Sequence, residues 1–316
     1  MLVTVTLNAA IDKTYRLQRL RPGQLHRTRE QLSLAGGKGI NVARVAKTLG
    51  ADVIATGFIA GHNGQFIAEG CARAGITPAF VEIAGESRCC LTLLDEESGE
   101  VTEVLEQGPA VTEEDFAQLQ GKLKQLASQA AFVAFSGSLP AGLLPDAYRT
   151  LLELVRQSGA EPILDASGAA LANGLAGKPY LVKPNREEAE ALLGYRLESV
   201  EAVRQALRDI QARGAERVFL SLGESGAWLL ADEEEWHFPA VSLEQVVNPV
   251  GCGDALLAGL LTGRLKGLAW PDAARLGMAS AAANALSLGA GMVDPAAVDR
   301  LVQQARGSSG QQEHAR

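Results

Sequence analysis

The sequence predicts an α/β protein with a mostly parallel central sheet, and three observations lead to this prediction. Apolar strand-like stretches alternate with stretches of helical period from residue 2 to residue 288. Strands that alternate with helices of about 10–15 residues form βαβ units. The chain has 316 residues, of which 47% are hydrophobic, so it can bury a large core. Two glycine-rich turns, at 36–39 and 251–253, lead directly into apolar helices.

The elements follow one another in a regular order. Strands are expected at 2–7, 52–60, 131–135, 161–164, 180–182 and 218–221. Helices are expected at 39–49, 64–74, 143–157, 200–212, 254–265 and 272–288.

Two segments, near 13–34 and 87–106, break this alternation. Both are charged, have a period of two and lack a following helix. Within the second, residues 88–95 and 101–105 flank the sequence Glu-Glu-Ser-Gly, which predicts a β-hairpin. We expect one domain over 1–305 with a small β lid formed by these two segments. The polar tail at 306–316 is expected to be disordered.

Composition excludes several classes of partner. The formal net charge is −8 and the pI is near 5.2, which argues against nucleic acid and against an anionic membrane. No apolar run reaches the ~18 residues of a membrane span, and no leader pattern follows Met1, so a cytoplasmic protein is expected. The cysteines (Cys71, Cys89, Cys90 and Cys252) form no C-x-x-C pair and the four histidines are scattered, which favours reduced thiols and no structural metal.

The turn Gly251-Cys252-Gly253 carries the strongest local signal. Successive backbone N–H groups at the positive end of a helix dipole form an anion hole. Asp254 follows this turn at the helix start. It is either a helix cap, a position that Asp favours, or a base beside a phosphate-binding turn.

The turn at Gly36-Gly37-Lys38-Gly39 is the second signal. Its glycines allow another molecule to approach the backbone at a helix start. It does not fit G-x-x-x-x-G-K-[ST], and neither turn fits the dinucleotide fingerprint G-x-G-x-x-G.

Together, the stretches at 36–44 and 248–255 resemble the two signatures of the PfkB/ribokinase carbohydrate kinases, and the resemblance covers roughly residues 2–301. Five further motifs resemble the hexose-phosphate branch, which contains tagatose-6-phosphate kinase and 1-phosphofructokinase. They are Thr-Leu-Asn-Ala-Ala-Ile-Asp at 6–12, Ser-Gly-Ser-Leu-Pro at 136–140, Leu-Asp-Ala-Ser-Gly at 164–168, Lys-Pro-Asn-Arg-Glu-Glu at 183–188 and Ser-Leu-Gly-Glu-Ser-Gly-Ala at 221–227. The resemblance implies a ribokinase-like fold with a β lid, and an ATP- and Mg²⁺-dependent sugar-phosphate kinase.

The resemblance also implies a role for each matching residue. Asp254 would be the catalytic base, and the amides of Gly251, Cys252 and Gly253 would form the anion hole. The sugar would contact Asp12, Gly37, Lys38 and Asn41, although Asp12 could instead be a turn residue. Arg88 would bind the substrate phosphate, with Arg27 and Lys38 as further candidates.

On the nucleotide side, Lys183, Asn185, Ser221, Gly223, Gly226 and Asn284 would bind ATP. Asn185 and Glu188 would arrange Mg²⁺ through water, since Mg²⁺ keeps several waters. The alternative for Glu188 is a solvated acid in the first turn of a helix. Two residues depart from the family pattern: Cys252 stands where Ala or Ser is usual, and Asn248 stands where many members have Asp. Cys252 would be either a packing residue or a reactive thiol at a helix N-terminus.

The expected substrate is tagatose 6-phosphate, with fructose 1-phosphate as the alternative. The alternative outside the enzymes is a non-catalytic sugar-phosphate sensor on the same fold. The apolar face of the lid, with Cys89 or Cys90, Leu91 and Leu93, would be exposed in a monomer, so a homodimer through the lid is expected.

Overall fold

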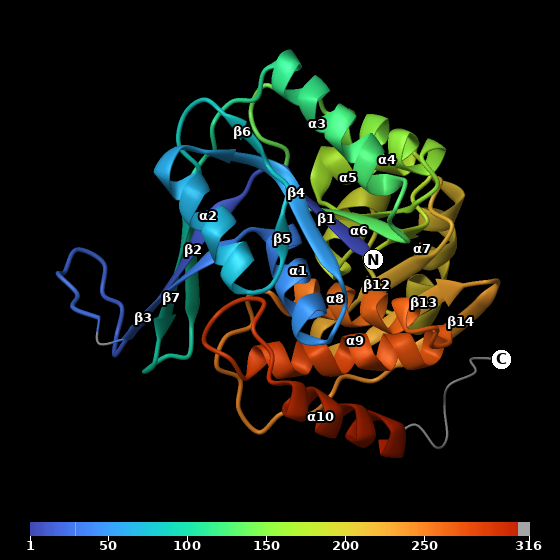
Figure 1. The fold of residues 1–316 in the computed structure, drawn as a ribbon. Helices are drawn as coiled ribbons and strands as arrows, with labels where there is room; N and C mark the ends of the chain where they lie inside the picture. Colours follow the sequence, from blue (N-terminus) through green and yellow to red (C-terminus); the bar gives the residue numbers. More distant parts are fainter. Residues whose placement is uncertain (29, 309–316) are drawn as a thin grey trace.

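The computed structural model describes residues 1–28 and 30–308, and its core is a ten-stranded sheet (Figure 1). Nine strands follow the order β14-β13-β12-β11-β10-β9-β1-β4-β5, and β6 also pairs with β4. Their bounds are β1 Leu2–Thr6, β4 Val53–Ala60, β5 Thr77–Pro78, β6 Val81–Ile83, β9 Phe132–Ser136, β10 Glu161–Asp165, β11 Leu181–Val182, β12 Val218–Ser221, β13 Ala227–Ala231 and β14 Glu234–Phe238. All neighbours pair in parallel except β12–β13 and β13–β14, which confirms a mostly parallel sheet.

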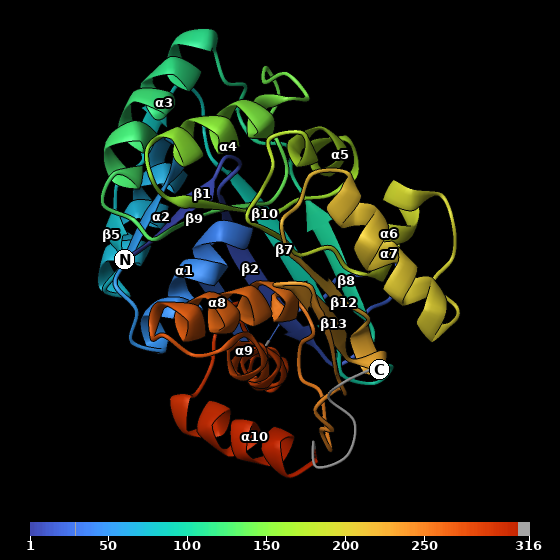
Figure 2. The same ribbon diagram turned by 90° about the vertical axis from the view of Figure 1, so that its right-hand side faces the viewer.

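Helices cover both faces of this sheet. Figure 2 shows α3, α4 and α5 on one side, and α8, α9 and α10 on the other. The bounds are α1 Lys38–Thr48, α2 Gly61–Arg73, α3 Glu113–Ala127, α4 Ala147–Gln157, α5 Gly168–Leu175, α6 Arg186–Leu193, α7 Val200–Ala212, α8 Cys252–Leu265, α9 Trp270–Ala285 and α10 Pro295–Ser308. One apolar core packs α1, α2, α8 and α9 against one face of the sheet. A second core packs α3, α4, α5, α6 and α7 against the other face. The strands are therefore buried on both faces, as continuous apolar strands in a parallel sheet require.

The predicted lid is a separate four-stranded sheet in the order β3-β2-β7-β8. It is built from β2 Ala10–Leu17, β3 Glu30–Gly36, β7 Arg88–Asp95 and β8 Val101–Leu105. The predicted hairpin is confirmed, because β7 and β8 pair antiparallel with Leu94 opposite Val101. Strand β2 begins three residues before the predicted segment 13–34 and β3 ends two residues after it, so Asp12 lies within β2 and Gly36 within β3. Strands β7 and β8 lie within the predicted segment 87–106.

Several elements were not predicted. Helix α3 begins at a capping box in which Thr112 and Asp115 exchange hydrogen bonds, and the hairpin β13–β14 closes one edge of the main sheet. Helix α4 starts at Ala147 instead of residue 143, since Pro145 and Asp146 precede it in a turn. Helix α10 extends to Ser308, past the predicted tail boundary at 306, and residues 309–316 lie outside the described residues. Among the described helices, none is long and apolar enough to span a membrane.

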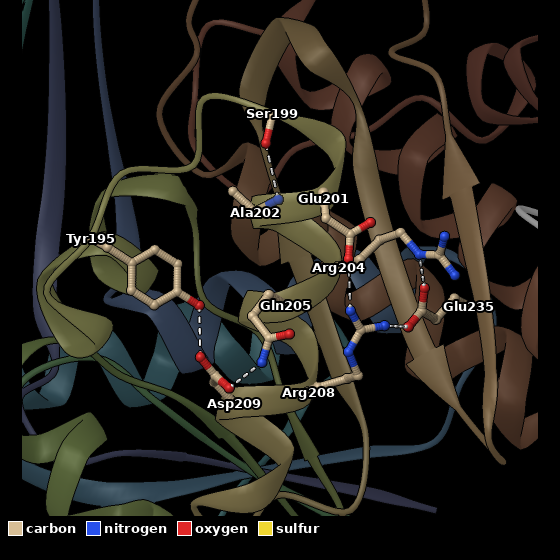
Figure 3. Close-up of polar contacts among 9 residues, drawn as sticks. All are labelled: Tyr195, Ser199, Glu201, Ala202, Arg204, Gln205, Arg208, Asp209 and Glu235. Atoms are coloured by element: carbon tan, nitrogen blue, oxygen red, sulfur yellow. Dashed lines mark hydrogen bonds and ion pairs between the residues drawn. The ribbon is translucent and has the colours of Figure 1, made fainter.

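An ion-pair network fastens the edge strand β14 to helix α7 (Figure 3). Glu235 of β14 accepts from Arg204 Nε at 2.5 Å and from Arg208 Nη1 at 2.9 Å. Arg208 Nη2 also donates to Glu201, two turns away on the same face of α7, at 3.2 Å. The carboxylate of Glu235 is largely buried, so both arginines bind it where solvent screens their charges little.

Candidate active site

Asp254 lies in the first turn of α8, which begins directly after the glycine turn. Gly251 precedes the helix in the left-handed conformation at φ +84°, and a Cβ there would lie 2.9 Å from the Cβ of Ala290. Gly251 is therefore the N-cap position, and the capping role considered for Asp254 is wrong. The Asp254 carboxylate is buried instead and accepts a hydrogen bond from Asn41 Nδ2 at 3.0 Å.

Burial sets the protonation of Asp254. It raises the pKa of this carboxyl to about 7, while Lys38, the Asn41 hydrogen bond and Lys183 oppose the rise. A group with a pKa near neutral exchanges protons readily at physiological pH, which is the property of a general base. This property suits the role of base that the resemblance implies for Asp254.

Two lysines and a buried aspartate lie beside this carboxylate. Asp165, at the end of β10, is fully buried. Its Oδ1 is 3.7 Å from Lys38 Nζ and its Oδ2 is 3.4 Å from Lys183 Nζ, and neither oxygen accepts a hydrogen bond from any described residue. This negative charge raises the pKa of Lys38. Both lysine ammonium groups therefore lie beside Asp165 at the same end of the sheet.

Asp165 is a site residue that the sequence motifs did not identify, although it lies within the motif at 164–168. Its signal is the position of a carboxylate at the end of the apolar strand β10. In a parallel sheet the carboxyl ends of strands form the ligand-binding edge. That rule alone would have placed Asp165 among the candidates.

The start of α8 is an electropositive site. A Cβ at Gly253 would lie 3.3 Å from Lys183 Nζ, so this buried ammonium lies over the backbone of the turn. Backbone N–H groups, the helix dipole and an ammonium together favour a phosphate. Burial raises the pKa of the neighbouring Cys252 thiol, and its Sγ accepts from Asn284 Nδ2 at 3.5 Å. Packing is therefore the reading that the geometry favours for Cys252.

Asp12 projects from β2 toward the start of α1. Its Oδ2 accepts from the backbone N–H of Gly37 at 3.3 Å, and a Cβ at Gly36 would lie only 2.1 Å from its Cγ. The alternative of a turn residue is wrong, because Asp12 lies inside a strand. Burial raises the pKa of Asp12, while Arg44 and Arg88 lower it.

Of the two arginines predicted to bind the substrate phosphate, only Arg88 lies beside these residues. Its Nε and Nη2 donate to the backbone oxygen of Asn8 at 3.2 and 3.1 Å, and its Nη1 donates to that of Glu106 at 3.2 Å. A guanidinium has five N–H donors, so two are left for a ligand. Arg27 is exposed on the loop between β2 and β3, which extends away from the main sheet (Figure 1). The structure does not bring Arg27 to the other site residues of this chain.

Asn185 and Glu188 form the capping box of α6. Asn185 Oδ1 accepts from the Glu188 N–H at 2.8 Å, and Glu188 Oε2 accepts from the Asn185 N–H at 2.9 Å. Glu188 is therefore part of the helix cap, and the alternative of a solvated acid in the first turn is wrong. Its other oxygen, Oε1, points to Lys38 Nζ at 3.9 Å and remains available.

These oxygens bear on the expected Mg²⁺. The described residues contain no group of three or more His, Cys, Asp or Glu side chains that could hold a metal by themselves. Mg²⁺ is usually bound by one or two carboxylates together with waters and substrate phosphates. The Oε1 of Glu188 and the oxygens of Asp165, which lack hydrogen-bond donors among the described residues, fit that requirement.

The predicted nucleotide residues divide into two groups. Ser221 ends β12 and bridges to Asn185, and Gly223 and Gly226 shape the following turn with positive φ. Asn284, by contrast, is fully buried, and its amide donates to Val250 O at 2.9 Å and accepts from the Gly291 N–H at 2.8 Å. Asn284 therefore braces the glycine turn of α8, and its buried amide is not placed for the predicted nucleotide contact.

This chain is similar in sequence and structure to known proteins. The model of the pfkB family carbohydrate kinases matches residues 5–297. A candidate phosphofructokinase from Staphylococcus aureus is 31% identical, with a TM-score of 0.81 over 96% of this chain and 97% of that one. Phosphofructokinase-2 from Escherichia coli in complex with potassium is 28% identical, with a TM-score of 0.89 over 96% and 99%.

A third structure, a candidate 1-phosphofructokinase from Thermotoga maritima, is 27% identical, with a TM-score of 0.88 over 96% and 97% of the two chains. The predicted ribokinase-like fold is confirmed, since a ribokinase also superposes with a TM-score of 0.75. The family model spans nearly the whole chain, including both glycine turns, the lid and the buried carboxylate of α8. This chain therefore belongs to the pfkB family of carbohydrate kinases and is an ATP-dependent sugar kinase.

Proposed function

We propose that this kinase transfers the γ-phosphoryl group of ATP to a free hydroxyl of a ketohexose phosphate, with tagatose 6-phosphate as the leading substrate and tagatose 1,6-bisphosphate as its product. The observation that carries the proposal is the buried Asp254 carboxylate, hydrogen-bonded by Asn41 at the anion-binding start of α8. A non-catalytic sensor would have no use for a base with a pKa near 7 beside a phosphate site.

The residues divide the reaction between them. Asp254 accepts the proton of the attacking hydroxyl as the new O–P bond forms and the bond to the leaving ADP breaks. The amides of Gly251 and Gly253 hold the charge that develops on the transferred group, together with Lys183. The N–H of Cys252, included in the predicted anion hole, donates to the Pro249 oxygen at 3.3 Å. Asp12 and the N–H groups around Gly37 hold the sugar.

Mg²⁺, when bound, would neutralise charge on the ATP phosphates. Glu188 Oε1 and Asp165 are the residues that would hold it, with water completing its shell. Lys38 and Lys183 flank this position and would contact the same phosphates.

Arg88 supplies the donors for the phosphate already on the substrate. It lies near Asp12, so it would face a sugar bound on that residue. A charged guanidinium with two unused N–H groups suits a phosphate, whereas a neutral sugar would leave that charge unmatched.

The two alternatives differ in the position of the substrate phosphate. Fructose 1-phosphate is favoured by the likeness to the Thermotoga maritima protein, and fructose 6-phosphate by the likeness to phosphofructokinase-2. ADP release measured in parallel with tagatose 6-phosphate, fructose 1-phosphate and fructose 6-phosphate ranks the three by kcat/KM. Tagatose 6-phosphate is expected to be highest; a higher value for either fructose phosphate would replace it, and no turnover with any of them would leave the sensor.

The same proposal includes a homodimer formed through the lid. Leu91 and Leu93 are half-buried, and on β8 Val104 and Leu105 are 49% and 60% exposed. Leu91 pairs directly with Val104 across the β7–β8 ladder, so these two side chains share one face of the lid with Leu93 and form an apolar patch. Leu105 pairs with Cys90 and lies on the other face. Contact between two such lids would remove this patch from water.

A further inference from the structure

Arg44 on α1 bridges three segments of the chain beside the site. Its Nη1 donates to Asn41 Oδ1 at 3.2 Å and to the backbone oxygen of Ala290 at 2.9 Å. Its Nη2 donates to the backbone oxygen of Ala35 in the lid strand β3. The guanidinium thus joins the lid, α1 and the loop after α9.

The contact with Asn41 decides which way that side chain faces. An amide has an oxygen that only accepts and an NH₂ group that only donates. Because Asn41 Oδ1 accepts from Arg44, its Nδ2 is directed to Asp254 Oδ2 at 3.0 Å. The reversed amide would place Oδ1 against the carboxylate and the NH₂ group against the guanidinium, and both contacts would be repulsive.

We propose that Arg44 is a positioning residue for phosphoryl transfer, which holds the Asn41 amide in the orientation that donates to Asp254. This role depends on the hydrogen bond of the guanidinium to Asn41 and is distinct from the effect of the Arg44 charge on Asp254. This inference rests on the proposed role of Asp254 as the base.

The close packing of Gly291 supports this contact between Arg44 and Asn41. Gly291 lies against it with φ +68°, and a Cβ at this position would lie 2.9 Å from Arg44 Nη1 and 2.9 Å from Asn41 Cβ. Asn41 is also almost completely buried. Bulk solvent therefore has little access to this amide, and its orientation depends on Arg44.

Other charges also face Asp254 and must be separated from this effect. Lys38 and Arg44 face it from α1, Asp165 from the end of β10 and Lys183 from the segment after β11; on its own helix it lies near the Cys252 thiol. Loss of the Arg44 charge would raise the pKa of Asp254 by itself. A lysine at position 44 keeps that charge but cannot reproduce the fork of the guanidinium.

The test is the titration of the Asp254 carboxyl, followed by carbon-13 NMR without substrate. Variants Arg44→Lys, Asn41→Ala and their combination are compared with the parent protein, and the resonance is assigned with Asp254→Asn. Arg44→Lys and Asn41→Ala should both move the midpoint to higher pH, because donation from Asn41 stabilises the carboxylate. Arg44→Lys should add no further shift in the Asn41→Ala background. An unchanged midpoint in Arg44→Lys, or shifts that add in the double variant, would overturn the proposal.

Kinetics supply an independent readout. The acid limb of kcat/KM should move with the NMR midpoint in Arg44→Lys, and kcat should fall by about tenfold, a part of what a positioned base contributes. The matched control is Arg264→Met, which removes a guanidinium from the Leu268 oxygen at the far end of α8. It should lower the melting temperature without moving the midpoint. Absence of turnover in the parent protein would refute the proposed function, while the substrate-free titration would still decide the role of Arg44.

Discussion

Helices α1 and α8 begin in the same way but carry opposite charges. Each starts after a glycine with positive φ, at +98° for Gly37 and +84° for Gly251, and neither has a side-chain cap. The first turn of α8 holds the carboxylate of Asp254, which the helix dipole favours, whereas that of α1 holds the ammonium of Lys38, which the dipole opposes. Lys38 is kept charged there by Asp165 and Glu188.

The difference teaches how the site divides its work. In the proposed function, the α8 start would carry the base and the phosphoryl-binding amides, so changes there should act on kcat. Asp12 and Arg88, on the lid strands β2 and β7, would face the sugar phosphate, so changes to them should act on KM. The following predictions test this division.

The largest effect is expected at Asp254. Asp254→Asn keeps the size of the side chain but removes the proton acceptor, so kcat should fall by roughly 10²–10⁴-fold while ATP binding survives. Steady-state kinetics and nucleotide titration measure the two quantities. Because Asp254 caps nothing, near-normal turnover in Asp254→Asn would contradict the kinase mechanism.

The same variant should be more heat-stable than the parent at pH 8. Burial raises the folded-state pKa of Asp254 to about 7, above its unfolded value, so this carboxyl lowers stability as pH rises from about 4 to about 7. Its replacement by a neutral amide removes that cost. Thermal midpoints at pH 5 and pH 8 should differ more in the parent than in Asp254→Asn, and an equal pH dependence would argue against the raised pKa.

A pH profile sharpens the comparison further. The base must be deprotonated, so kcat/KM should rise about tenfold per pH unit below about 7 and then level off. Arg88→Ala, on the sugar side, should leave this limb in place. A limb near pH 4 would mean that Asp254 titrates as an ordinary exposed carboxyl.

Arg88→Ala tests the lid side. Loss of a charge-assisted phosphate contact, worth about 1.5–3 kcal/mol, should raise KM for the sugar phosphate by about 10- to 150-fold and leave that for ATP nearly unchanged. Arg27→Ala is the matched control, since Arg27 lies away from the site within its own chain. Equal losses for both substrates would make Arg88 a structural residue.

The smallest effect on chemistry is expected from the lid patch. Leu91→Asp places a charge in the apolar surface proposed to join two lids, so sedimentation should shift toward monomer and sugar binding should weaken. Glu100→Gln, in the exposed turn between β7 and β8, changes a charge outside this patch and serves as the control. An unchanged sedimentation profile for Leu91→Asp would remove the lid dimer.

Much of the fold followed from periodicity. Helix α7 and strand β12 have the predicted bounds, because a long amphipathic stretch and a short apolar run leave few alternatives. The hairpin β13–β14 was not predicted, since Glu234 and Glu235 interrupt its apolar pattern. The pairing of Glu235 with arginines of α7 compensates for this charge, and a distant contact of this kind leaves no local trace in the sequence.

The site was predictable to a similar degree. The residues of the glycine turns lie together as their motifs implied, but Asn284 and Glu188 illustrate the limit. Both carry the predicted side chains, yet the structure uses the amide of Asn284 and one oxygen of Glu188 to hold backbone N–H groups and, for Asn284, a backbone oxygen. A motif indicates which residue is needed and does not indicate which of its atoms remain available to a ligand.

The fastening of β14 to α7 has a consequence for the rigidity of the nucleotide side. Edge strands commonly exchange their amide hydrogens early because they fray. Here Glu235 holds the edge to a helix through two guanidinium groups, and β14 leads at Phe238 into the segment against which Gly226 packs. The β14 amides that pair with β13 should therefore exchange more slowly than those of an unanchored edge strand, and a fixed edge would help the turn at 223–226 to hold its shape without nucleotide.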